Sequence, residues 1–151
     1  MARVYSAVGS AVGGTDITIV TLISATTVRP ELFEIVVGSV STPADQAIKL
    51  SIMRFTAVGT EGSGFTPTAA DPASPAAAGD MGVGVFSVEP TYTASSDLLW
   101  ISINQRNTFR WIAQEGRELV APATANNGLG LRSKSATSTT PTWDTTFRWR
   151  E

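Results

Sequence analysis

Residues that could carry out covalent chemistry are scarce in this sequence. It has no histidine and no cysteine, so it lacks the usual general base, a thiol nucleophile and the commonest zinc ligands. A serine–lysine dyad could use Lys134, which lies between Ser133 and Ser135, but adjacent positions on a strand point to opposite faces. We therefore predict that the chain is not an enzyme and that it has no catalytic, metal or cofactor site.

Glycines and carboxylates form no recognised binding motif either. Gly9, Gly13 and Gly14 are not followed by the Lys-Ser/Thr pair of a phosphate-binding loop, and Gly82-Val83-Gly84 lacks the third glycine of a dinucleotide site. The 13 acidic residues are scattered and show no calcium-loop spacing. We interpret the glycines as turn residues and as positions where strands pack closely.

The charge balance argues against nucleic acid and membranes as partners. The chain has 11 basic and 13 acidic residues with no basic cluster, whereas nucleic-acid binding depends on Lys and Arg that neutralise phosphates. The apolar run at 17–23 is far shorter than the roughly 20 residues of a membrane-spanning helix, and Asp16 would interrupt a signal peptide. Only 16% of the residues are charged, which suggests that a partner covers part of the surface.

Composition and periodicity favour β-structure. Val, Ile, Thr, Phe and Trp dominate the apolar runs, and 13 glycines and 8 prolines interrupt them too often for long helices. Short strands separated by frequent turn residues are typical of a sandwich or barrel. We predict one all-β domain over residues 1–151, an antiparallel two-sheet, jelly-roll-like sandwich with strands at 17–23, 32–38, 47–56, 82–89, 98–104, 108–113, 118–121, 128–134 and 143–150.

In two of these runs, aliphatic residues occupy every second position. In 47–56, three aliphatic residues share one face, and Lys49, Ser51 and Met53 share the other. In 98–104 the alternation is similar, although both faces carry some apolar residues. We expect a mostly buried core that includes Ile48, Leu50, Ile52, Leu99, Ile101, Phe109 and Trp111.

Two short segments carry turn signals. Asn127-Gly128 is the strongest, because both residues accept a positive φ, and we expect it to link 118–121 to 128–134. Residues 104–107, Asn-Gln-Arg-Asn, predict a tight connection into the following strand.

The triplet Phe109-Arg110-Trp111 recurs as Phe147-Arg148-Trp149. On a strand, each copy places its two rings on one face and its arginine on the other. We interpret the rings as parts of one core and the arginines as facing outward. The alternative is a binding face made of aromatic rings and arginines.

Two segments rich in small residues lie outside the predicted strands. Segment 57–80 reads AVGTEGSGFTPTAADPASPAAAGD, and a loop this long in a compact domain is usually functional or disordered. Its prolines favour an extended path suited to contact with a neighbouring molecule, and a mobile surface loop is the alternative. Residues 1–16 are rich in Gly and Ala too, and we expect an N-terminal arm or a disordered tail there.

Four segments follow one another in a recognisable order: AIKLSIMRFTAVGTEGSG, FTPTAADPASPAAAG, GRELVAPATANNGLGLRSKSA and WDTTFRWRE. Their order and spacing resemble those of small structural proteins of tailed-phage virions, over roughly residues 30–151. Ala69-Ala70-Asp71 departs from the Pro-Leu-Asp type of sequence in that family. The resemblance implies a jelly-roll domain at the capsid surface that decorates or cements the shell, with the major capsid protein as partner and a homotrimer as oligomeric state.

We expect the contacts of such a protein to come from the N-terminal arm and from segment 57–80, with the interface residues Phe65, Pro67, Asp71, Pro72 and Pro75. Two other classes of protein stay open. One is a carbohydrate-binding module whose stacking platform would be Trp100, Trp111, Trp143 or Trp149. The other is a tail or adhesin component that binds a host receptor.

Overall fold

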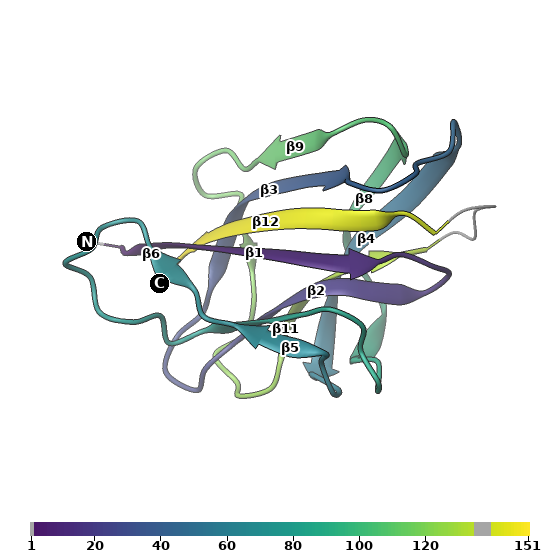
Figure 1. Ribbon diagram of the computed structural model, residues 1–151. Coiled ribbons are helices and arrows are strands. Elements are labelled where there is room, and N and C mark those ends of the chain that lie inside the picture. Colours follow the sequence, from purple (N-terminus) through teal and green to yellow (C-terminus); the bar gives the residue numbers. More distant parts are fainter. Residues whose placement is uncertain (1, 135–139) are drawn as a thin grey trace.

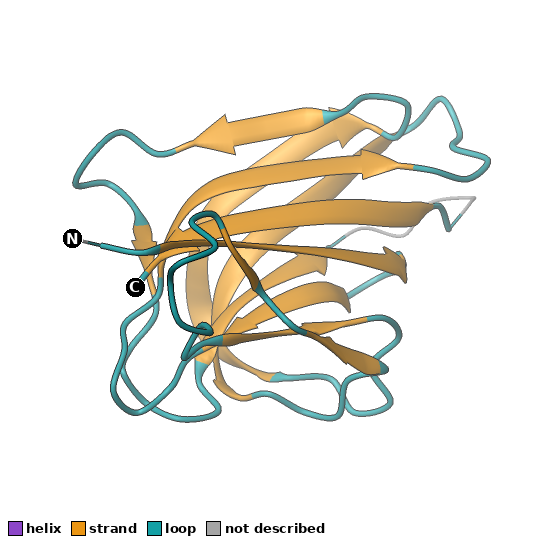
Figure 2. Cartoon of the chain, turned by 60° about the vertical axis from the view of Figure 1, so that its left-hand side comes forward, coloured by secondary structure: helices purple, strands orange, loops and turns teal. Residues whose placement is uncertain are grey.

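The computed structural model describes residues 2–134 and 140–151. Within these residues the chain forms strands and loops, and no helix (Figure 2). Two antiparallel sheets pack against each other, which confirms the predicted β-sandwich. The strands are β1 (Val4–Val12), β2 (Ile17–Ile23), β3 (Glu31–Ser39), β4 (Ala47–Ala57), β5 (Ser63–Phe65), β6 (Thr68–Ala69), β7 (Asp80–Val83), β8 (Thr91–Asn104), β9 (Phe109–Ile112), β10 (Leu119–Val120), β11 (Gly128–Ser133) and β12 (Thr142–Arg150).

The strand order is jelly-roll-like. Sheet A has the order β10-β3-β12-β1-β6, with β9 also paired to β3, and sheet B has the order β5-β7-β2-β11-β4-β8 (Figure 1). When the short strands are left out, the order of neighbouring strands is β1-β12-β3-β9 in one sheet and β2-β11-β4-β8 in the other. The first and last strands of the chain therefore pair with each other. This winding brings both chain ends to the same end of the molecule (Figures 1 and 2).

Each of the nine predicted runs overlaps a strand, but two of them differ from it by more than two residues at one end. The run at 82–89 is only β7, which ends before Gly84, where φ is +82° and the chain leaves the sheet. The run at 98–104 is the last part of β8, which begins at Thr91. The early part of β8 is polar, and register shifts interrupt its pairing with β4, so it lacks the simple alternation that marks a strand.

The stretch expected as an N-terminal arm is instead strand β1, which lies between β12 and β6 in sheet A. Its inward positions include Ala7, Gly9 and Ala11. They are small because sheet B lies close behind them: a Cβ on Gly9 would overlap the side chain of Val83. Small residues here reflect close packing of two sheets, not chain flexibility.

Segment 57–80 is not one long loop either. It contains β5, which pairs with β7 in sheet B, and β6, which pairs with β1 in sheet A. Phe65 of β5 packs against the core of its own chain. The longest irregular part of the segment follows β6, and residues 71–79 are named the 71–79 loop.

Both predicted turns exist, but neither joins two neighbouring strands. The residue with positive φ is Asn126, at +63°, one position before the predicted pair, and Gly128 already belongs to β11. In the other turn, the N–H of Asn107 donates to the carbonyl of Asn104 at 3.0 Å. This turn carries the chain from β8 in sheet B to β9 in sheet A, so it is a corner of the sandwich and not a hairpin.

The core lies between the sheets, and large aromatic rings from the two ends of the chain form one wall of it. Tyr5 of β1 and Trp143, Phe147 and Trp149 of β12 are buried, and the rings of Tyr5 and Trp149 lie 6.1 Å apart. Of the predicted core, Ile48, Leu50, Ile52 and Ile101 are buried. The others are half-buried and pack against the core from the outer strands β8 and β9: Leu99, Phe109 and Trp111.

Leu50→Ala and Ile101→Ala are each expected to lower the free energy of unfolding by about 2–5 kcal/mol, because each removes methyl groups that are in contact with other side chains and leaves a cavity. Urea denaturation of the two variants measures this. Val88→Ala is the control, since Val88 is 57% exposed and its truncation should have little effect. Unchanged stability in both core variants would contradict the finding that these two side chains face the core.

Candidate functional site

The 71–79 loop lies beside the two chain ends and is held by residues far away in the sequence. The hydroxyl of Tyr5 donates to the carbonyl of Pro75 at 3.1 Å. Just before the loop, the N–H of Ala70 donates to the carbonyl of Val4 at 2.8 Å. The N-terminal strand therefore fixes the loop at its start and near its middle.

Glu151 fixes the other end of the loop. Its carboxylate accepts hydrogen bonds from the N–H groups of Ala78 and Gly79, at 2.8 and 2.9 Å, and from the indole N–H of Trp149 at 2.9 Å. The main chain of Glu151 in turn pairs with Arg3 in both directions at 2.9 Å. The loop and both chain ends thus form one connected structure.

The tip of the loop is exposed and has a defined shape. Asp71 forms a turn there: its Oδ1 accepts the N–H of Ala73 and its carbonyl accepts the N–H of Ser74, both at 2.9 Å. Pro72 and Pro75 are exposed on either side of this turn. Three predicted interface residues, Asp71, Pro72 and Pro75, therefore sit on one displayed loop.

The other two predicted interface residues lie elsewhere. Phe65 is half-buried in β5, and Pro67 is half-buried in the link that crosses from β5 to β6. Because its ring packs against the core of its own chain, Phe65 does not project as an anchor toward a neighbour. A hollow of about 570 Å³ does lie beside the loop tip, between Asp71 and Arg3.

A second hollow, a groove of similar volume, crosses the outer face of sheet A. It has a volume of about 580 Å³ and lies over β1, β3 and β12, and it reaches the edge of sheet B. Its apolar lining includes Val8, Val36, Val40, Phe65 and Val83. Sequence reasoning did not predict this groove, because it needs β1 to be a strand. The available signal was the placement of valines at positions 8 and 12 between small residues.

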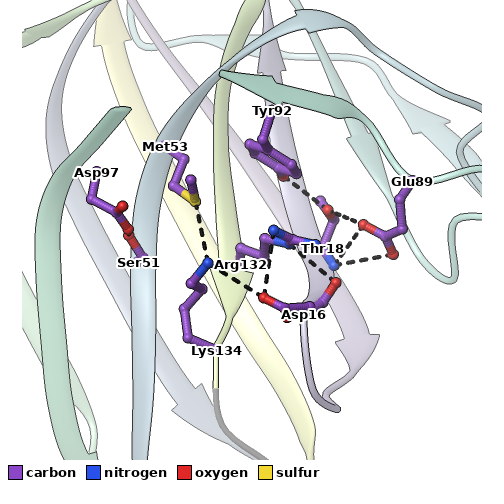
Figure 3. A network of polar contacts seen from close by, with 9 residues as sticks. All are labelled: Asp16, Thr18, Ser51, Met53, Glu89, Tyr92, Asp97, Arg132 and Lys134. Carbon is purple, nitrogen blue, oxygen red and sulfur yellow. Dashed lines mark hydrogen bonds and ion pairs between the residues drawn. The ribbon is translucent and has the colours of Figure 1, made fainter. Parts of the chain in front are cut away.

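On the outer face of sheet B, in contrast, the chain itself covers part of the surface through a polar network (Figure 3). Thr18 of β2 lies at its centre. The Thr18 hydroxyl contacts the Glu89 carboxylate and lies 2.8 Å from the Tyr92 hydroxyl, and the Thr18 N–H donates to Glu89 Oε2 at 3.1 Å. A Cβ on Gly130 would overlap the Tyr92 hydroxyl, so the absence of a side chain at this position leaves room for the ring over β11.

The ionisation of Tyr92 fits a structural role. Burial raises the pKa of Tyr92 well above its ordinary value; the hydrogen bond with Thr18 and the charge of Arg132 lower it, and the charge of Glu89 raises it. The phenol therefore stays protonated at neutral pH and acts as a hydrogen-bond donor. The network ties residues 89–92 to sheet B.

Charged residues continue this network toward the end of β11. Asp16 lies 3.3 Å from Lys134 Nζ and 3.5 Å from Arg132 Nη1 (Figure 3). Lys134 Nζ also lies 3.8 Å from Met53 Sδ. The side chain of Lys134 is thus engaged away from Ser133, which is buried, and Ser135 lies outside the described residues.

The two arginines of the repeated triplet converge on one carboxylate. Arg110 Nε lies 2.7 Å from Glu34 Oε1, and Arg148 Nη1 lies 2.8 Å from Glu34 Oε2. Burial alone would raise the pKa of Glu34, but the hydrogen bonds and charges of Arg148 and Arg110 outweigh it and hold the pKa below its ordinary value. The rings of both triplets point to the other side of sheet A, so the predicted separation is confirmed and a joint aromatic–arginine face is wrong.

The four tryptophans have unequal access to solvent. Trp143 and Trp149 are fully buried, and Trp111 is half-buried against the core. Trp100 of β8 is 63% exposed, and Lys49 Nζ lies 3.2 Å from the centre of its ring. Trp100 is therefore the tryptophan that could serve as a stacking platform.

Within residues 2–134 and 140–151, no three His, Cys, Asp or Glu side chains lie together in a way that could hold a metal ion. The part of the chain that the structure describes has no helix long and apolar enough to span a membrane. A scan against protein-family models, a search of curated proteins and a search of solved structures found no match to the chain.

Glu34→Gln is expected to lower the free energy of unfolding by about 1–3 kcal/mol at neutral pH, because charged hydrogen bonds become neutral ones. The folded-state pKa of Glu34 lies below the unfolded-state value of about 4.3, so wild type has this contribution above that pH and loses it as the pH falls through the folded-state pKa. Denaturation at neutral pH and at about pH 3 should therefore show a difference between the two proteins that shrinks on acidification.

The exposed Glu115, changed to Gln, is the control for the loss of one negative charge. It should not alter stability at either pH. A Glu34→Gln effect of the same size at both pH values would show that the ionised carboxylate does not provide the stabilisation.

Proposed function

We propose that this chain is a structural virion protein that decorates or cements a viral capsid shell through protein–protein contacts. Its partner in this proposal is the major capsid protein, and three copies form a homotrimer at the capsid surface. Support comes from the resemblance of residues 30–151 to phage virion proteins and from the jelly-roll-like sandwich, a fold used by viral capsid proteins and lectins alike. Because one fold hosts many functions, a particular surface must provide the contacts with the capsid.

The observation that carries the proposal is the 71–79 loop, which is held firmly while its tip stays exposed. Tyr5 and Glu151 anchor it from the two chain ends. Pro72 and Pro75 restrict its main chain further. A partner that binds a loop already in its bound shape loses less conformational entropy on binding. The hollow between Arg3 and Asp71 offers room for a side chain of that partner.

A second candidate function, binding of a glycan, is favoured by Trp100. Its ring is exposed, and Lys49 is fixed against it. Exposed tryptophans provide flat apolar surface with a hydrogen-bonding edge, which suits stacking of a sugar ring. In this case binding would depend on β8 and not on the 71–79 loop.

Asp71→Lys is expected to weaken binding to capsids at least about tenfold, because it reverses the charge of the loop tip and removes the side-chain hydrogen bond of the turn. The double variant Pro72→Gly/Pro75→Gly should weaken binding about fourfold to thirtyfold, since each proline lost adds about 0.4–1 kcal/mol of ordering cost. Co-sedimentation with capsids assembled without this protein measures the affinity, and the melting temperature checks that each variant is folded.

Glu115→Lys is the matched control, because it makes the same charge change at an exposed residue in another turn and should bind like wild type. If both loop variants bind capsids as wild type does, the loop is not the interface. Loss of binding in Trp100→Ala, together with binding of a soluble glycan by the wild-type protein, would favour the second candidate instead.

A further inference from the structure

Strand β1 has one edge that is paired only in part. Toward β12 it pairs along its whole length, from Val4 to Val12. Toward β6 it pairs only at Tyr5 and Ser6, because the chain crosses between β5 in sheet B and β6 in sheet A at residues 66–67. Among the residues that the structure describes, none pairs with the open edge from Ala7 to Val12.

The hydrogen-bond pattern shows which main-chain groups face this open edge. On the β12 side, the main chain of residue 3 exchanges hydrogen bonds with Glu151, and the N–H of residue 13 donates to the carbonyl of Pro141. On the β6 side, the carbonyl of Val4 accepts the N–H of Ala70. Main-chain groups alternate sides along a strand, so the even-numbered residues face away from β12. The N–H and carbonyl groups of Val8, Ser10 and Val12 are therefore available to a further strand.

The side chains beside this edge are mostly apolar. Val8 and Val12 are 49% and 43% exposed on the outer face of sheet A. Phe65 and Val83, at the edge of sheet B, line the same groove of about 580 Å³. Asp144 supplies the one charged side chain among the described lining residues, and it lies across β1 from the open edge, opposite Ser10.

We infer that the open edge of β1 binds an extended segment of the shell protein, which adds to sheet A as an edge strand alongside Val8–Val12. This inference deepens the proposed function and rests on it. Alternate side chains of such a segment would contact Phe65 and Val83 on one side and lie beside Val8 and Val12 on the other. The segment is apolar and carries at most one basic residue, near Asp144.

Two features favour the shell protein over a second copy of this chain. The open edge continues directly from β6, and the 71–79 loop follows β6, so one partner can contact the loop and the edge together. Pairing of two β1 edges with each other would be twofold symmetric and would close after two copies, whereas the proposed assembly is threefold.

Ser10→Pro tests the inference, because it removes one N–H from the open edge and leaves the pairing with β12 intact. Proline is tolerated at such edge positions. Co-sedimentation with capsids assembled without this protein should show binding at least about tenfold weaker than wild type. Ser10→Ala, which keeps the N–H and removes only the hydroxyl, is the matched control and should bind like wild type.

Val8→Lys is a second variant that does not depend on how well proline is accommodated. A lysine on an edge strand opposes the addition of an apolar strand, and we expect a loss of similar size. Circular dichroism and the melting temperature confirm folding of each variant. If both Ser10→Pro and Val8→Lys bind capsids with wild-type affinity, the inference is wrong. That result would not contradict the proposed function.

Two further results would also overturn it. If wild-type protein does not bind capsids, the proposed function fails together with this inference. If light scattering without capsids shows that Ser10→Pro dissociates the oligomer, while capsid binding is unchanged, the edge is occupied by a second copy of the chain.

Discussion

The rest of the structure depends on the antiparallel ladder between β1 and β12. It pairs the two strands from Val4 with Arg150 to Val12 with Thr142. Because these strands lie near opposite ends of the chain, the ladder joins the two ends within sheet A and brings Tyr5 against Trp149 in the core. It also places Glu151 where its carboxylate can hold the 71–79 loop. Loss of the ladder would therefore remove a wall of the core and both anchors of the loop.

The two sheets differ in how their outer faces are covered. Over sheet B, contacts of Thr18 with Glu89 and Tyr92 hold the chain's own residues in place. Over sheet A the apolar groove stays open, and the edge of β1 from Ala7 to Val12 has no partner among the described residues. The 71–79 loop follows β6, which pairs with the start of that edge. The apolar groove, the open part of the β1 edge and the 71–79 loop therefore lie together next to β1, whereas the exposed ring of Trp100 lies on β8 of sheet B.

Sequence reasoning could predict what depends on local patterns, but not what depends on distant contacts. The strand 47–56 was predictable, because Ile48, Leu50 and Ile52 alternate with other residues. Strand β1 was not, since its inward alanines and glycine have the composition of a flexible tail, and the requirement for glycine at position 9 comes from the distant Val83, which a Cβ there would overlap. For the candidate site, sequence reasoning could single out the proline-containing loop. It could not show that Tyr5, 70 positions from Pro75, holds the loop in place.

Amide hydrogen exchange along β1, measured on the free protein, tests the central claim most directly, namely that β1 is a strand with one paired and one open edge. We expect slow exchange for Ala7, Gly9 and Ala11, whose N–H groups face β12, and fast exchange for Val8, Ser10 and Val12, whose N–H groups face the open edge. Fast exchange at all six positions would mean that the segment is an arm. Slow exchange at all six would mean that the edge is already covered, and either result would contradict the account.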